Sequence, residues 1–223
     1  MSATTHVRQH NSMLAAAEKR ALIWIASRLP RWINSDHLSA LGLAAMAGAG
    51  ASFCAAQVDP IAGAILVVLC LLLNWFGDSL DGTVARVRDQ QRPRYGYYVD
   101  HVIDLAGTAL LFTGLAVSGY MSPLIATLVV AAFFLVSAET YLATHSRGIF
   151  KMAFVGVGPT ELRILMAAGA VALIRTPTVD FLGLGQVRLW DLGGVIGAIG
   201  MAATFVITSA RNVRALYVEE RLQ

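Results

Sequence analysis

The sequence predicts an all-α polytopic membrane protein with six transmembrane helices and an N-terminal interfacial amphipathic helix. Three observations lead to this fold class. Of the 223 residues, 57% are hydrophobic and only 14% are charged, whereas about a quarter of the residues of a soluble domain are charged. Several apolar runs approach the roughly 20 residues that a spanning helix needs. Basic residues also gather in alternate connections between these runs, which is typical of polytopic membrane proteins.

The apolar runs give the predicted spans in chain order. Most of them reach spanning length once their flanks are included. The fifth run is short by itself, and residues 158–175 can span only if Glu161 and Arg163 face protein rather than lipid. We therefore expect a transmembrane domain over residues 38–218 after an N-terminal segment over residues 1–37. The six runs cover residues 38–58, 61–77, 102–118, 120–143, 164–174 and 192–209.

The N-terminal segment carries the predicted interfacial helix. Residues 13–33 place apolar and basic side chains at roughly helical spacing, with Trp24 and Trp32 beside the basic ones. This interleaving is typical of a helix lying at the level of the lipid headgroups, although a soluble leader helix is the alternative. Pro30 breaks the helix, and residues 34–36 offer an N-cap for the first span.

Charge distribution predicts the orientation. A cytosolic N-terminus and C-terminus place all but Arg175 and Arg188 of the 17 basic residues on the cytosolic side, as the positive-inside rule requires. The net charge of +3 then matches the anionic lipids of the cytosolic leaflet. No basic stripe or recognition module indicates a nucleic-acid partner.

Two neighbouring predicted helices carry carboxylates at their cytosolic ends. Nothing breaks the second helix before Pro93, so it carries Asp78 and Asp81 at a spacing that places both on one face. Asp100 and Asp104 share one face of the third helix, which begins near residue 95. A short connection makes these helices antiparallel neighbours, and we expect the two acidic faces to meet at one depth.

Such a cluster has a chemical consequence. Four carboxylates repel one another strongly at low dielectric, so they take up protons or bind cations, and hard oxygen ligands suit Mg²⁺, Mn²⁺ or Ca²⁺. A solvated helix cap explains a single such aspartate about equally well, but not four on matched faces. Gly82, Ala85 and Gly96 leave room for a ligand, and Arg86 offers a cation suited to phosphate. Together these residues indicate a site for a phosphorylated ligand.

The spacing of eight residues resembles the signature of the CDP-alcohol phosphotransferases. One departure is that nine residues separate Arg86 from Gly96, one more than in the common pattern, and the extra residue falls in the connection around Pro93. The resemblance implies a six-helix fold over nearly the whole chain, and a homodimer. The matching residues are Asp78, Asp81, Gly82, Ala85, Arg86, Gly96, Asp100 and Asp104.

The resemblance also implies roles. Asp78, Asp81 and Asp100 would hold one or two Mg²⁺ or Mn²⁺ ions, with Asp104 close to these ions and acting as the general base toward the acceptor hydroxyl. Attack on phosphorus would displace CMP. The residues implied to bind the CDP-linked substrate are Gly82, Ala85, Arg86 and Gly96.

The sequence gives weaker signals for the acceptor alcohol than for the aspartate cluster. Six polar residues could face the cytosolic cavity, with ordinary helix-end charge as the alternative: Glu139, His145, Arg147, Lys151, Glu161 and Arg163. The Pro-Thr-Glu segment at 159–161 resembles the choline and ethanolamine phosphotransferase branch, which gives a headgroup to diacylglycerol. The compact chain favours the other branch, which transfers a phosphatidyl group from CDP-diacylglycerol to a small polar alcohol.

Two other classes of protein are alternatives to an enzyme. A cation transporter would need broken helices or repeated halves, and a purely structural membrane protein would have no use for the eight residues.

Overall fold

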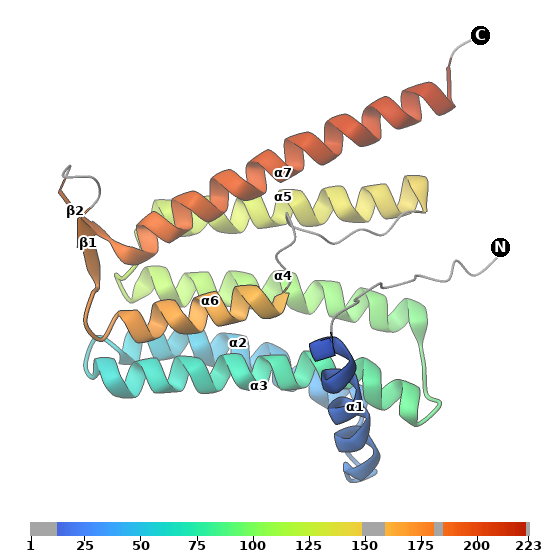
Figure 1. The fold of residues 1–223 in the computed structure, drawn as a ribbon, viewed down its shortest axis with the longest axis horizontal. Helices are drawn as coiled ribbons and strands as arrows, with labels where there is room; N and C mark the ends of the chain where they lie inside the picture. Colours follow the sequence, from blue (N-terminus) through green and yellow to red (C-terminus); the bar gives the residue numbers. More distant parts are fainter. Residues whose placement is uncertain (1–12, 149–158, 181–184, 222–223) are drawn as a thin grey trace.

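The computed structural model describes residues 13–148, 159–180 and 185–221. Within these ranges the chain forms seven helices and one short antiparallel hairpin (Figure 1). In chain order the elements are α1 (Met13–Arg28), α2 (Ser35–Ala55), α3 (Pro60–Val87), α4 (Pro93–Val117), α5 (Pro123–Arg147), α6 (Pro159–Ala172), β1 (Thr178–Asp180), β2 (Gln186–Arg188) and α7 (Leu189–Glu219).

Helix ends follow local sequence signals. The predicted cap of the first span is confirmed, because the Asn34 side chain accepts from the backbone N–H of His37 and the His37 ring accepts from the backbone N–H of Asn34. The Asp59 side chain caps α3 by accepting from the backbone N–H groups of Ile61 and Ala62. Proline occupies the first position of α3, α4 and α5, where its missing N–H costs nothing. Gly148 ends α5 with a φ of 64°.

Five helices, α2, α3, α4, α5 and α7, are long and apolar enough to cross a membrane, and the chain is an integral membrane protein. The fifth predicted span corresponds to α6, whose 14 residues fall short of the roughly 20 that a crossing needs. The count of six spans is therefore not confirmed. Figure 1 shows α6 alongside α3 within the bundle. The hairpin after α6 was not predicted, because its strands are only three residues long.

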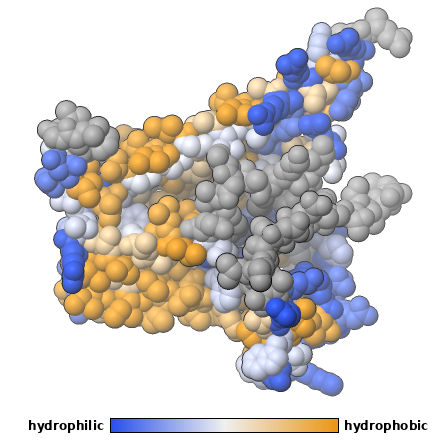
Figure 2. Space-filling view, in the orientation of Figure 1, coloured by the Kyte–Doolittle hydropathy of each residue, from blue (hydrophilic) through white to orange (hydrophobic). Residues whose placement is uncertain are grey.

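The surface of the bundle is hydrophobic over its middle and hydrophilic at its two ends. Figure 2 shows hydrophobic side chains covering the flank formed by α3 and α6 and the part of α7 nearest the hairpin. Hydrophilic residues gather at the two ends of the bundle. This banded surface is what a chain surrounded by lipid over its middle requires.

The centre of the fold is α2, which packs against both α3 and α4. Glycines allow this close approach: a Cβ on Gly114 of α4 would lie 2.3 Å from the backbone of Gly50 in α2, and one on Gly63 of α3 would lie 2.3 Å from Ala56. Close backbone contact at small residues is a common way to pack helices in membranes. Phe53 and Leu115 are completely buried in the adjoining core.

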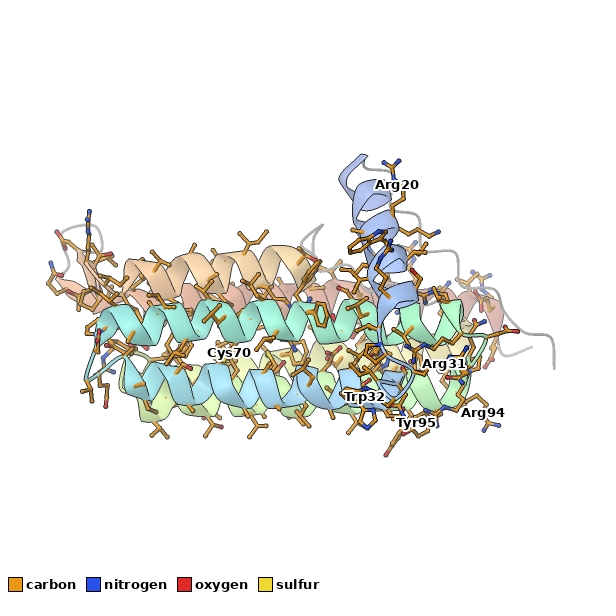
Figure 3. The ribbon with its side chains drawn as sticks, turned by 90° about the horizontal axis from the view of Figure 1, so that it is seen from below. Arg20, Arg31, Trp32, Cys70, Arg94 and Tyr95 are labelled. Carbon is orange, nitrogen blue, oxygen red and sulfur yellow. The ribbon has the colours of Figure 1, made fainter. Side chains whose placement is uncertain are left out.

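The first helix lies across one end of the bundle, transverse to the other helices (Figures 1 and 3). Its inner face buries Ala26 in a cluster with residues of α2 and α3. The side chain of Arg88, just after α3, donates to the backbone carbonyls of Leu29, Pro30, Arg31 and Ile33. Trp24 and Trp32 are 58% and 73% exposed. This orientation suits an interfacial helix, which remains a prediction.

We expect Gly114→Ala to lower the midpoint of thermal unfolding in detergent, because a methyl group at 2.3 Å from backbone atoms must push α2 and α4 apart. Overpacking of this kind costs about 1–3 kcal/mol. Gly200→Ala in α7 is the matched control, since its Cβ would meet no atom within 4 Å. Equal midpoints for Gly114→Ala and the wild type would contradict the close packing.

Candidate active site

The four signature aspartates line a single pocket, where α3 and α4 meet α2. The predicted meeting of the two acidic faces is therefore present in the structure. It follows from helical periodicity on α3 and α4, which run antiparallel to each other and both pack against α2. The lining residues are Ser39, Gly42, Asn74, Asp78, Asp81, Asp100, Ile103 and Asp104.

Asp81 is the most deeply buried of the four, with 8% of its surface exposed. One carboxylate oxygen accepts from the Ser39 hydroxyl at 2.7 Å, and the other accepts from the backbone N–H of Gly82. A buried carboxylate needs such donors, because burying a charge without them is costly. Sequence reasoning missed Ser39, whose only signal is a hydroxyl inside an apolar run.

Asp78 is paired with an arginine from a distant helix. The Arg163 Nη2 atom in α6 lies 2.6 Å from Asp78 Oδ2, and its Nε donates to Asn74 Oδ1 at 2.7 Å. The amide nitrogen of Asn74 in turn donates to the carbonyl of Gly42 at 3.0 Å. The chain of contacts therefore runs from α6 through α3 to α2. Arg163 is one of the six polar residues that the sequence predicts near the acceptor alcohol. The sequence does not predict the contact of Arg163 with Asp78.

The donor set of the pocket fits a hard divalent ion. Carboxylate oxygens are the ligands that Mg²⁺ and Mn²⁺ prefer, and four carboxylates face one cavity. Among the described residues, however, no three His, Cys, Asp or Glu side chains are already arranged to hold an ion.

The remaining signature residues lie near the ends of α3 and α4. Arg86 donates to the Thr83 hydroxyl at 3.0 Å and lies over Gly82, where a Cβ would be 3.2 Å from its Nη1. A Cβ on Gly96 would meet no atom within 4 Å. Ala85 lines a second cleft, formed where the turn before α2 faces the α3–α4 connection. The other residues of this cleft are Asn34, Ser35, Asp36, Val84, Gln90, Gln91 and Arg92.

Two acceptor candidates lie instead between α5 and α7. Asn212 of α7 donates to Glu139 Oε1 at 2.5 Å and accepts from Arg147 Nη1 at 2.6 Å. These contacts join two helices, and neither Glu139 nor Arg147 lines the aspartate pocket. His145 is exposed. Lys151 lies outside the described residues, as does the side chain of Glu161.

Comparisons with known proteins decide the family. A family model described as CDP-alcohol phosphatidyltransferase matches residues 36–209. The chain belongs to the CDP-alcohol phosphatidyltransferase family. This family member is therefore a transferase of a phosphate-containing group. The five-residue connection over 88–92, between α3 and α4, lies within the stretch where its signature has one residue more than the common pattern.

Solved structures confirm the fold of this CDP-alcohol phosphatidyltransferase. Its structure is similar to that of Mycobacterium tuberculosis phosphatidylinositol phosphate synthase with CDP-DAG bound, with a TM-score of 0.61 and 20% sequence identity. The similarity covers 92% of this chain and 99% of the mycobacterial chain. A search of the curated proteins finds no match.

The contacts of Glu139 predict a structural role for this residue. We expect Glu139→Leu to lower the thermal midpoint in detergent, because the Asn212 amide would lose its acceptor at a cost of about 1–3 kcal/mol. Glu139→Gln is the matched control, because its amide oxygen can still accept from Asn212. A wild-type midpoint for Glu139→Leu would show that the contact contributes nothing to stability.

Proposed function

We propose that this enzyme transfers a phosphatidyl group from CDP-diacylglycerol to a small polar alcohol and releases CMP, in a reaction that depends on Mg²⁺ or Mn²⁺. The main support is that one pocket of this CDP-alcohol phosphatidyltransferase is lined by four aspartates, Asp78, Asp81, Asp100 and Asp104. Further support comes from the similar mycobacterial synthase, which was solved with CDP-DAG bound.

The proposed mechanism divides the aspartates by role. Asp78, Asp81 and Asp100 would hold one or two divalent ions, with Asp104 beside them. Held there, such ions would neutralise the diphosphate and make the phosphorus more electrophilic. Asp104 accepts the proton of the acceptor hydroxyl, the hydroxyl oxygen forms a bond to phosphorus, and the bond from phosphorus to the CMP oxygen breaks. The products are the phosphatidyl alcohol and CMP.

We place the nucleotide of the CDP-linked substrate along Gly82, Ala85 and Arg86, with Gly96 across from them. Support comes from the cleft at Ala85, from the absence of side chains on the two glycines, and from a guanidinium suited to phosphate. Arg92, which lines the same cleft, donates twice to Asp36 at 2.6 and 2.8 Å.

We further propose that the active site and both termini lie on the cytosolic side, that residues 1–37 form the interfacial segment, and that the enzyme is a homodimer. The orientation is supported by the basic residues near the aspartate end of the bundle, where Figure 3 places Arg31 and Arg94 with Trp32 and Tyr95. Aromatic and basic side chains together are typical of a membrane interface. The homodimer is supported by the resemblance to the family.

An activity assay tests the proposal. Purified protein in detergent receives Mg²⁺ or Mn²⁺ and CDP-diacylglycerol with glycerol 3-phosphate, serine, inositol or inositol phosphate. Parallel reactions contain diacylglycerol with CDP-choline or CDP-ethanolamine. We expect CMP release with CDP-diacylglycerol and one acceptor, and loss of this release when the metal is chelated.

The Asp104→Asn variant tests the general base. We expect its CMP release to fall on the order of 100-fold or more, which is the usual contribution of such a group. The control is Asp89→Asn, at an exposed position in the connection with a φ of 56° that asparagine tolerates. Equal activity of both variants would remove Asp104 from the mechanism. Release only from CDP-choline or CDP-ethanolamine would establish the headgroup branch instead.

A further inference from the structure

Arg163 contacts Asn74 and Asp78 of the acidic pocket from a helix that carries none of the signature residues. Its side chain is 16% exposed and that of Asp78 is 33% exposed, and the two form an ion pair at 2.6 Å. No basic residue is among the described residues that line the pocket itself. Arg163 therefore brings a positive charge to a cavity whose charged lining residues are all acidic.

A second contact holds the arginine independently of Asp78. Nε of Arg163 donates to Asn74 Oδ1 at 2.7 Å, and the Asn74 amide is fixed by its bond to the Gly42 carbonyl. The guanidinium can thus release one partner and keep the other.

We infer that Arg163 is the resident counter-cation of Asp78 and exchanges with the divalent ion at this carboxylate, so that ion binding turns the guanidinium away while Asn74 retains it. This inference rests on the proposed metal site. An ion ligated by the Asp78 carboxylate would repel a guanidinium held 2.6 Å from Oδ2, because like charges this close interact strongly in a partly buried pocket.

The present arrangement of the pocket agrees with this exchange. The four aspartates share one cavity. One of these carboxylates, Asp78, is engaged by Arg163. In the exchange, ion binding breaks this contact, and the energy of the contact is subtracted from the affinity for the ion.

Direct Mn²⁺ binding to the purified full chain in detergent, measured by electron paramagnetic resonance without substrate, tests the exchange. We expect Arg163→Met to bind Mn²⁺ about tenfold more tightly than the wild type, because a charge-assisted hydrogen bond no longer competes. Arg163→Lys, which retains a competing charge, should stay close to the wild type. Arg175→Met, at an exposed position after α6, should match the wild type.

The outcomes separate this inference from the proposed function. Asp78→Asn should weaken Mn²⁺ binding if the pocket is the metal site. If Asp78→Asn does so while Arg163→Met binds no more tightly than the wild type, the exchange is overturned and the metal site stands. Tighter binding by Arg163→Lys equal to that of Arg163→Met would also overturn the exchange. Absence of Mn²⁺ binding in every variant would overturn both.

Discussion

Repulsion among four carboxylates in one pocket is the constraint on which the rest of this structure depends. At low dielectric their mutual repulsion is large, and a folded chain must supply donors or cations to offset it. The Asp81 carboxylate accepts hydrogen bonds from the Ser39 hydroxyl of α2 and from a backbone N–H of its own helix. The Asp78 carboxylate accepts from the Arg163 guanidinium of α6. The charged and polar groups of this site therefore come from four helices, α2, α3, α4 and α6.

Close packing of the helices makes this arrangement sterically achievable. The Ser39 hydroxyl reaches Asp81 only because α2 lies directly against α3, and a Cβ on Gly77 would stand 2.5 Å from the carbonyl oxygen of Leu38. Outside the pocket, the Arg88 side chain donates to backbone carbonyls of the turn before α2, and Arg92 forms an ion pair with Asp36. The connection that carries the signature spacing therefore contacts the turn before α2 through Arg88 and α2 itself through Arg92.

The charged residues on α5 and α6 have different structural tasks, although they resemble one another in the sequence. Arg163 of α6 contacts the aspartate pocket directly. Glu139 and Arg147 of α5 are joined through Asn212 of α7, which fastens α5 to α7. Polar contacts between membrane helices commonly contribute about 0.6–2 kcal/mol each. The first residue is thus placed to affect ligand binding, and the other two are placed to hold the helices together.

The sequence by itself determined the membrane class, the positions of the long helices, the Asn34 cap and the grouping of the four aspartates. These features depend on composition or on periodicity within one helix, which the order of residues sets directly. Only the tertiary structure decided that Ser39 donates to Asp81, that Arg163 pairs with Asp78, and that Asn212 bonds Glu139 and Arg147, two of the residues predicted near the acceptor. Each of these contacts joins residues that lie at least 42 positions apart in the chain, and a helical period fixes the face of a residue but not the partner that packs against that face.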